Sequence, residues 1–281
     1  MIQVENLHFS YTKVPFIQNM NFTVHSGEIF GFLGPSGAGK STVQKILTGL
    51  IGTYQGNVLV QNREVKHPHK DFYETIGVDF EFPSLYEKLT ARENLRFFAS
   101  LYKKTLPLEP LLESVGLASE ADKKVAEYSK GMKSRLNFIK SLVHEPQLLF
   151  LDEPTSGLDP SNARLVKDLI LEQKAKGRTI ILTTHNMFDA TELCDRVAFI
   201  VDGSIRALDS PRNLIMKRGA HQISYTYQSE GLEHQRNVGL STTADDMMLQ
   251  MLIKENHLLS IHSSEPNLND IFSELTGRRL Q

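Results

Sequence analysis

The sequence contains a single cysteine, Cys194, among 281 residues. One thiol cannot form a disulfide within the chain, so the fold must be held together by its core, as expected in a reducing cytoplasm. The context Glu192-Leu193-Cys194 is typical of a helix, and no neighbouring motif is of a kind that lowers the pKa of a thiol. We therefore expect Cys194 to be a buried, unreactive thiol.

Long apolar runs are also absent. The longest uninterrupted run is Val197 to Val201, five residues, whereas a helix that spans a membrane needs about 20. The first six residues, Met1 to Asn6, lack the basic segment and the apolar core of a signal peptide. These absences predict a chain that does not cross a membrane and lies in the cytoplasm.

Neither sign of charge is in clear excess, because 31 Lys and Arg face 33 Asp and Glu, a formal net charge of −2. Basic side chains that neutralise phosphates supply most of the affinity for nucleic acid. The near balance therefore removes the main argument for a nucleic-acid-binding protein and leaves only a local basic patch open. The apolar share of 40% is ordinary for a globular protein, and at about 150 residues per domain the length predicts between one large domain and two.

Short apolar segments and helical patterns alternate along the chain. The first apolar segments predict strands at 2–4, 16–24, 29–33 and 57–60. Helical patterns then dominate to about residue 145, and Thr90 with Glu93 forms the capping-box pattern at the start of one helix. Over 148–201 three strands alternate with two helices, which predicts a parallel sheet.

A glycine-rich stretch follows the apolar run Ile29 to Leu33. It matches the phosphate-loop pattern G-x-x-x-x-G-K-[ST] and comprises Gly34, Pro35, Ser36, Gly37, Ala38, Gly39, Lys40, Ser41 and Thr42. Glycines let backbone N–H groups turn toward phosphate oxygens, and the positive end of the helix that begins near Lys40 adds to the attraction. We expect Lys40 to reach the β and γ phosphates and Ser41 to bind Mg²⁺. The alternative is a strand-to-helix turn without a ligand.

Two carboxylates, Asp152 and Glu153, follow the apolar strand Leu148 to Leu151. Strands of an α/β sheet deliver side chains to a ligand at their carboxyl ends. Asp152 fits the Mg²⁺ shell, and Glu153, which points the other way, fits the group that orients or deprotonates the attacking water. Taken alone such a pair is usually a solvated loop, but together with the phosphate loop upstream it predicts a nucleotide hydrolysis site.

The histidines differ in their context. His185 directly follows the strand predicted at 179–184, and a parallel strand would bring it to the same sheet edge as the carboxylates. A lone histidine is usually structural, but this position favours contact with the γ phosphate. By contrast, His67 and His69 bracket Pro68 with no cysteine or carboxylate at ligand spacing, so we expect no metal site there.

Five motifs, taken in order, resemble those of the ATP-binding subunit of ABC transporters. Besides the phosphate loop, the carboxylate strand and Thr184-His185, they include Tyr128 to Lys133, YSKGMK, which stands where that family carries its signature sequence. The fifth is Ser156 to Asp159, SGLD, which matches the D-loop of the family. The resemblance covers roughly residues 1–216 and implies an ATPase whose cofactors are ATP and Mg²⁺.

The fold that the resemblance implies is a P-loop nucleotide-binding cassette of the α/β class. Its mainly parallel core sheet would be joined by an N-terminal antiparallel β subdomain and by a helical signature subdomain at about 84–145. The pattern of the sequence changes near residue 219, so we place the cassette at 1–218. A small C-terminal α/β extension at 219–281 would follow, and its role stays open.

Several residues take their expected roles from the resemblance. Tyr11 stands where the family places an aromatic ring to stack on adenine, the alternative being a strand tyrosine in the core. Ser129 and Gly131, at the start of a helix, would bind the γ phosphate of ATP held by another subunit. Asp159 would reach across the same junction. ATP would thus join two cassettes, identical or different, head to tail.

The chain also departs from the family pattern. Glu81 occupies the position after the strand ending near Val78 where the family commonly has glutamine, and its carboxylate could bind Mg²⁺ directly or act as a sensor. Lys130 and Met132-Lys133 stand where the commonest signature has glycine and glutamine. This form of the signature, and the ending Phe272 to Gly277, are similar to the type-2 group of drug, peptide and ion exporters.

The resemblance implies separately encoded transmembrane permease subunits as partners, so the chain would lie peripherally on the cytoplasmic face of the cell membrane. We expect it to dock through Phe80, Phe82, Leu85 and Tyr86 together with the helix after Thr90. The alternative is that these side chains pack in the core. ATP bound between two cassettes would close them and turn the permease outward, and hydrolysis would reopen them.

Other functions remain open at this stage. An ABC importer subunit would use the same chemistry in the opposite direction, and only the signature form and the tail argue against it. A soluble ABC ATPase acting on nucleic acid or ribosomes usually adds a long coiled coil or a second cassette, and the sequence shows neither. A GTPase is disfavoured because no Asn-Lys-x-Asp sequence is present. Because the charge is balanced and neither a long coiled coil nor a second cassette is present, we expect no nucleic-acid partner.

Overall fold

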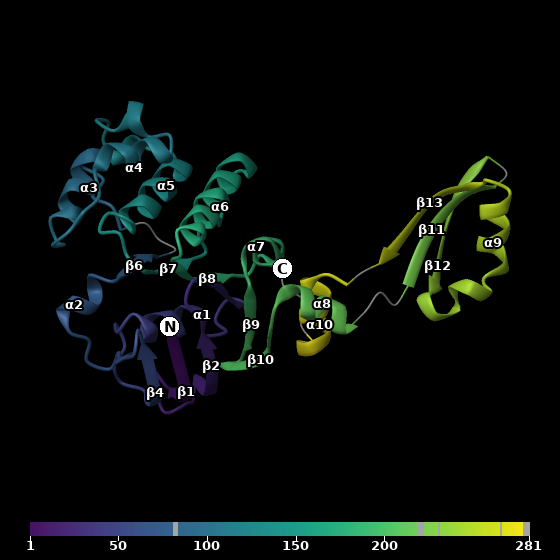
Figure 1. Cartoon of the computed structure of the whole chain (residues 1–281), viewed down its shortest axis with the longest axis horizontal. Coiled ribbons are helices and arrows are strands. Elements are labelled where there is room, and N and C mark those ends of the chain that lie inside the picture. The colour runs from purple at the N-terminus through teal and green to yellow at the C-terminus, as the bar shows by residue number, and fades with distance from the viewer. Residues whose placement is uncertain (81–83, 219–221, 230, 265, 278–281) are drawn as a thin grey trace. The chain divides into compact units, whose positions relative to one another are not determined.

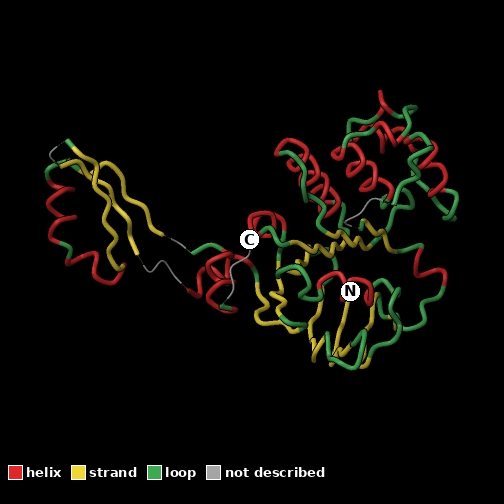
Figure 2. Tube along the Cα trace, turned by 180° about the vertical axis from the view of Figure 1, so that it is seen from behind, coloured by secondary structure: helices red, strands yellow, loops and turns green. Residues whose placement is uncertain are grey.

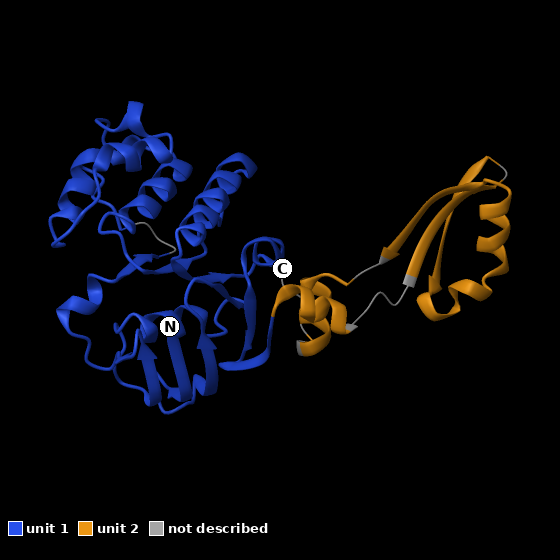
Figure 3. Cartoon of the chain, viewed as in Figure 1, with its two compact units in different colours: residues 1–209 blue, residues 210–281 orange. Residues whose placement is uncertain are grey.

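The computed structural model describes residues 1–80, 84–218, 222–229, 231–264 and 266–277. The chain divides into two compact units, Met1–Asp209 and Ser210–Gln281 (Figure 3). The change of sequence pattern predicts this boundary after residue 218 instead. The difference is the helix α8 (Pro211–Arg218), which packs against α10 (Leu268–Thr276) and so falls within the second unit.

A six-stranded sheet forms the centre of the first unit, in the order β10-β9-β3-β8-β7-β6. Figure 2 shows the strands of the chain in yellow and its helices in red. Every residue of β3, β7 and β8 is buried, as expected for strands covered on both faces. All neighbours pair in parallel except β10, which is antiparallel to β9. This confirms the predicted parallel sheet, whose strands are β3 (Ile29–Leu33), β6 (Ile76–Asp79), β7 (Leu148–Asp152), β8 (Thr179–Thr184), β9 (Arg196–Val201) and β10 (Ser204–Asp209).

A four-stranded antiparallel sheet, in the order β2-β1-β4-β5, forms the predicted N-terminal β subdomain. Buried and exposed residues alternate along its two long strands, so one face packs on the core that Phe30 and Phe150 of the central sheet also join. The strands are β1 (Ile2–Phe9), β2 (Ile17–Val24), β4 (Gln55–Val60) and β5 (Arg63–Glu64).

The helices α3, α4 and α5 gather into the predicted helical subdomain, apart from the antiparallel sheet (Figure 1). The expected capping box is present, since Thr90 Oγ1 accepts from Glu93 N at 3.1 Å and Thr90 N donates to Glu93 Oε2 at 2.8 Å. The α-helices of the first unit are α1 (Lys40–Leu47), α2 (Lys70–Tyr73), α3 (Ala91–Ala99), α4 (Leu108–Ser114), α5 (Lys130–Lys140), α6 (Pro160–Ala175) and α7 (Met187–Leu193).

The second unit contains a small antiparallel sheet, β12-β11-β13, with α9 beside it (Figure 1). Tyr225, Leu249 and Leu252 form a buried cluster between this sheet and α9. The first six residues of strand β12 are exposed, so the sequence there shows no apolar alternation that would predict a strand. The elements after α8 are β11 (Gln222–Ser229), β12 (Leu232–Gly239), α9 (Met247–Lys254), β13 (Leu258–Ser264) and α10.

Cys194 is buried directly after α7, as expected from the sequence. A Cβ atom on Gly31 would lie 2.7 Å from the sulfur, so only glycine leaves room for the thiol against β3. Burial raises the pKa of Cys194 far above its usual range, so the nucleophilic thiolate is not formed at physiological pH.

Candidate active site

The phosphate loop connects β3 to α1. Gly34 has φ +156° and Gly39 has φ +112°, and a Cβ atom on Gly34 would collide with the carbonyl oxygen of Ile200. Lys40 lies over its own loop, where its Nζ donates to the carbonyl oxygens of Gly34 at 2.7 Å and Pro35 at 3.2 Å. The predicted loop residues therefore form a tight turn with the lysine ammonium inside its curve.

Asp152 ends β7 beside the phosphate loop. Its Oδ1 accepts hydrogen bonds from Ser41 Oγ at 3.4 Å and from Thr183 Oγ1 on the neighbouring β8. A hydroxyl and a carboxylate oxygen at this spacing suit two adjacent positions of a Mg²⁺ shell, which the ion commonly completes with phosphate oxygens and water. In the described part of the chain, no three His, Cys, Asp or Glu side chains gather to hold a metal alone. Such an ion would therefore depend on this pair.

Glu153 and His185 face each other across the ends of β7 and β8. His185 Nδ1 lies 2.8 Å from Glu153 Oε1, and Thr184 Oγ1 donates to Glu153 Oε2 at 3.2 Å. The carboxylate is nearly buried whereas the imidazole is half-exposed. Glu153 has φ +51°, a left-handed conformation that few residues other than glycine adopt. Two neighbours thus hold the carboxylate oxygens in one orientation, and a strained residue at this place is typical of a functional site.

A cavity of about 210 Å³ is lined by the predicted catalytic residues and by most of the predicted phosphate-loop residues, but not by Gly34, Pro35 or Ala38. Phe16 adds an aromatic side chain that no sequence motif marks. Thr183 and Thr184 support the carboxylates, a role that the sequence did not reveal although the threonine pair precedes His185. The cavity is lined by Phe16, Ser36, Gly37, Gly39, Lys40, Ser41, Thr42, Asp152, Glu153 and His185.

Tyr11 lies beside this cavity rather than in the core, contrary to the alternative interpretation. Its ring is 59% exposed, and its hydroxyl lies 3.0 Å from Thr42 Oγ1. The ring meets Phe9 and Phe16 edge-on, with centroids 4.7 Å and 5.4 Å away. The face of the ring is therefore held in position next to the phosphate loop, as stacking on a base requires.

Ser129, Gly131 and Asp159 form a second cluster, and none of them lines the phosphate-loop cavity. Ser129 caps α5 by accepting from Met132 N at 3.2 Å, and a Cβ atom on Gly131 would lie 3.1 Å from the side chain of Asn162. Asn162 in turn donates to Asp159, the residue that caps α6. The amino ends of α5 and α6 thus meet through Gly131 and Asn162.

Glu81 and Phe82 lie outside the described residues, so their predicted roles stay predictions. Asp79, two positions earlier, is buried, and burial raises its pKa to about 7. Asn137 of α5 donates to its carboxylate. Both residues line a second cavity, of about 260 Å³, which shares Asp152 and Glu153 with the first. The end of β6 is therefore tied to the helix that carries the signature sequence.

Comparison with known proteins agrees with this geometry. Residues 17–156 match the model of the ABC transporter family. The whole chain is 52% identical to the Fluoroquinolones export ATP-binding protein of Mycobacterium tuberculosis, of which it covers 94%. It is 36% identical to the Nod factor export ATP-binding protein I of a Rhizobium species over 94% of this chain and 93% of that protein. A solved ATP-binding subunit of an ABC transporter superposes with a TM-score of 0.71 at 30% identity, covering 78% of this chain and 93% of that one.

The chain belongs to the ABC transporter family, and its fold is that of the ATP-binding cassette. It is the ATP-binding and ATP-hydrolysing subunit of an exporter, resembling the type-2 group. Subunits of this kind generally pair with transmembrane subunits and dimerise. Among the residues that the structure describes, no helix combines the length and the apolar character needed to cross a bilayer.

Proposed function

We propose that this chain drives the export of a small organic compound by ATP-dependent pairing of two cassettes on separately encoded permease subunits. The observation that carries the proposal is that Ser129, Gly131 and Asp159 do not line the phosphate-loop cavity. The phosphate-loop cavity holds Lys40, Ser41 and Glu153, whereas Ser129 and Asp159 lie at the joined ends of α5 and α6. A γ phosphate that needs both clusters would take the second one from another cassette.

The chemistry assigns a separate task to each residue of the first cluster. Lys40 would exchange the carbonyl oxygens of its loop for the β and γ phosphates. Ser41 and Asp152 would hold Mg²⁺, which supplies positive charge to the phosphates. Glu153 would orient or deprotonate the attacking water, with its carboxylate held by Thr184 and His185.

The second cluster suits an anion from outside the chain. The Ser129 hydroxyl and the backbone N–H groups at the amino end of α5 would be the donors, because the first N–H groups of a helix have no partner within it. Lys130 adds a positive charge next to them. The exposed Asp159 would then reach the second cassette, and whether that cassette is an identical chain is an outcome of the experiment below.

The permease would dock on the helical subdomain. Tyr86 and Phe97 are 49% and 41% exposed, although their rings pack edge-on against each other at 4.9 Å. Leu101 nearby is 62% exposed. A set of exposed aromatic and aliphatic side chains such as these is typical of a protein contact surface. Docking of the permease there would place the chain on the cytoplasmic face of the membrane.

The decisive experiment is the mass in solution of the Glu153→Gln chain with and without ATP and Mg²⁺, by light scattering after gel filtration. Slow hydrolysis in this variant should let the ATP-bound pair accumulate. We expect the mass to double with ATP and Mg²⁺, and to stay that of a monomer when Mg²⁺ is removed by a chelator.

The matched control adds Ser129→Arg to the same variant. The larger side chain blocks the second cluster but leaves the phosphate-loop cavity intact, so ATP should still bind and the mass should not double. Doubling in spite of Ser129→Arg would contradict the shared site. An unchanged mass in Glu153→Gln with ATP bound would contradict pairing of identical chains.

The names of the relatives support a substrate class that can be tested in cells. Since the chain is 52% identical over its whole length to a protein named for fluoroquinolone export, fluoroquinolones are the first compounds to test. Cells that express the chain with its membrane subunits should accumulate less of the drug than cells that express Glu153→Gln. Equal accumulation would point to another small organic compound.

A further inference from the structure

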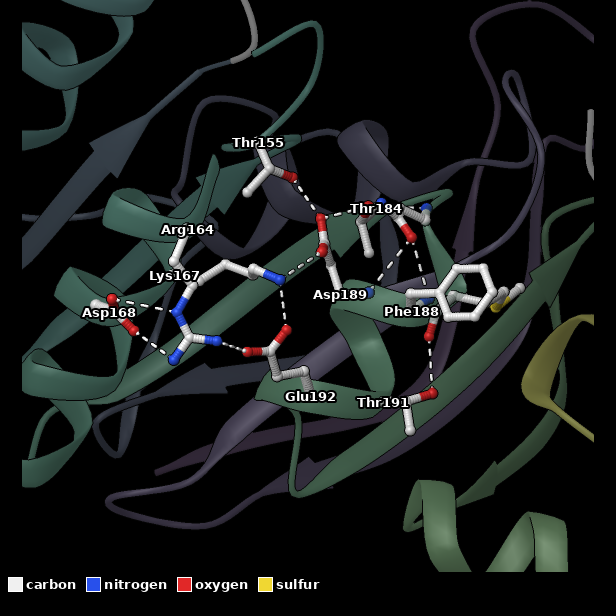
Figure 4. A network of polar contacts seen from close by, with 11 residues as sticks. Thr155, Arg164, Lys167, Asp168, Thr184, Phe188, Asp189, Thr191 and Glu192 are labelled. Atoms are coloured by element: carbon white, nitrogen blue, oxygen red, sulfur yellow. Dashed lines mark hydrogen bonds and ion pairs between the residues drawn. The ribbon is translucent and has the colours of Figure 1, made fainter. Parts of the chain in front are cut away.

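Asp189 joins three segments of the cassette that are far apart in the sequence (Figure 4). It lies in the first turn of α7 and is only 7% exposed. Its Oδ2 accepts hydrogen bonds from Thr155 Oγ1 at 2.7 Å and from Asn186 Nδ2 at 3.1 Å. Lys167 Nζ of α6 lies 3.3 Å from the other oxygen. A buried carboxylate thus has partners on the segment after Glu153, on the segment after His185 and on α6.

The contacts of Lys167 fix the two helices to each other. Glu192 of α7 pairs with Lys167 and, at 2.8 Å, with Arg164 of α6, and Arg164 pairs with Asp168 at 3.0 Å (Figure 4). The hydrogen bond to Glu192 raises the pKa of Lys167, so the ammonium keeps its charge. Asp159, at the end of the D-loop, caps α6, so the D-loop is attached to this pair of helices.

The segment that follows Glu153 and the segment around His185 contact each other at two places. Glu153 contacts His185 at 2.8 Å and Thr184 at 3.2 Å, next to the phosphate-loop cavity. Thr155 contacts Asp189 at a second place, and neither of these two residues lines that cavity. A displacement of the His185 segment at the first contact therefore reaches the segment 155–159 through the second one.

We propose that Asp189 is a positioning residue, which couples the His185 segment to the D-loop through the hydrogen bond from Thr155. The inference rests on the proposed two-cassette site, because Asp159 at the end of the D-loop would face the second cassette. The bond is a charge-assisted one to a buried carboxylate, and leaving that carboxylate with fewer donors is costly. The two segments therefore move together when the γ phosphate binds or leaves.

The test compares two substitutions of Thr155 in the full-length chain. Thr155→Val keeps the shape and removes the hydroxyl, whereas Thr155→Ser keeps the hydroxyl. We expect Thr155→Val to lower kcat for ATP about tenfold or more, with KM within about twofold, because a bond to a charged group is lost away from the phosphates. Thr155→Ser should restore kcat to near the wild-type value, which a role in packing alone would not predict.

A double-mutant cycle and a matched control complete the test. If Thr155 acts through Asp189, adding Thr155→Val to Asp189→Ala should lower kcat no further than Asp189→Ala does. The control is Asp168→Asn, which removes a carboxylate from the same network without touching Thr155, and it should turn over ATP like the wild type.

The possible results distinguish the positioning role of Asp189 from the proposed function. Wild-type kcat in Thr155→Val, or equal losses in Thr155→Val and Thr155→Ser, would overturn the positioning role while the proposed function stands. Absence of ATP turnover in the wild type and in Asp168→Asn would overturn the proposed function, and the positioning role with it.

Discussion

In the first unit, Asp152 and Asp189 accept hydrogen bonds from side chains of other strands, loops and helices, whereas in the second unit Asp246 accepts mainly from its own helix. Asp246 caps α9 through Met248 N and Leu249 N, both at 3.0 Å, and adds one bond from Tyr225 at 3.2 Å. The carboxylates of the first unit therefore connect different elements around the candidate site, whereas that of the second unit mainly stabilises the start of one helix.

Among the substitutions that test this difference between the units, Glu153→Gln should have the largest effect, and the effect should be on ATP turnover. Its amide cannot take a proton, so ATP turnover should fall about 10²- to 10⁴-fold while ATP still binds. Turnover by phosphate release and binding by calorimetry would check this. Glu172→Gln, on the exposed side of α6, is the control and should keep wild-type turnover. Normal turnover in Glu153→Gln would remove this residue from the catalytic machinery.

Lys40→Ala should act on binding instead. Because the ammonium lies inside the phosphate loop, its loss should weaken ATP binding about 10- to 100-fold, the value of a charge-assisted contact. Calorimetric titration with ATP and Mg²⁺ measures it. Lys45→Ala, five residues further along α1, is the comparison, and equal affinities of the two variants would show that the loop lysine does not contact phosphate.

Asp246→Ala should affect stability alone. Loss of a helix N-cap costs about 1 to 2 kcal/mol, so the second unit should melt at lower temperature while ATP turnover stays at the wild-type level. Calorimetric melting together with turnover would check both. A loss of turnover comparable to that of Glu153→Gln would mean that the second unit takes part in catalysis, and the contrast between the units would be wrong.

The smallest expected effect concerns pH. His144 is buried at the end of the helical subdomain, with Nε2 2.8 Å from the carbonyl oxygen of Ile76, and burial lowers its pKa. The unfolded chain binds the proton more tightly, so stability that is present above about pH 6.5 is lost as pH falls. His144→Gln should show a smaller drop in melting temperature between pH 7 and pH 5. An identical drop would assign the acid sensitivity to other groups.

Contacts between neighbours in the sequence were largely predictable. The capping box at Thr90, the glycine-rich turn before α1 and the strand ending at Asp152 each follow from residues a few positions apart. Parallel strands bring their carboxyl ends to one edge, so the approach of His185 to Glu153 was predictable as well.

Other contacts depend on how distant segments pack, and the sequence did not reveal them. Thr155 and Asp189 are 34 positions apart, and both residue types are common on solvated surfaces, so nothing in the pattern marks their bond. Strand β12 was missed for a different reason, because its exposed side chains leave no alternation to detect. The structure was needed for polar contacts such as that of Thr155 with Asp189, which the strand pattern does not bring together.

The close approach of Gly31 to the thiol of Cys194 has a practical consequence. The wild-type chain carries one sulfhydryl, and that one is shielded from reagents in solution. A cysteine introduced at an exposed position such as Asp168 or Met247 would therefore be the site of labelling without removal of the native residue. Pairs of spin or fluorescent labels could then follow the opening and closing of the ATP-bound state in an otherwise unmodified chain.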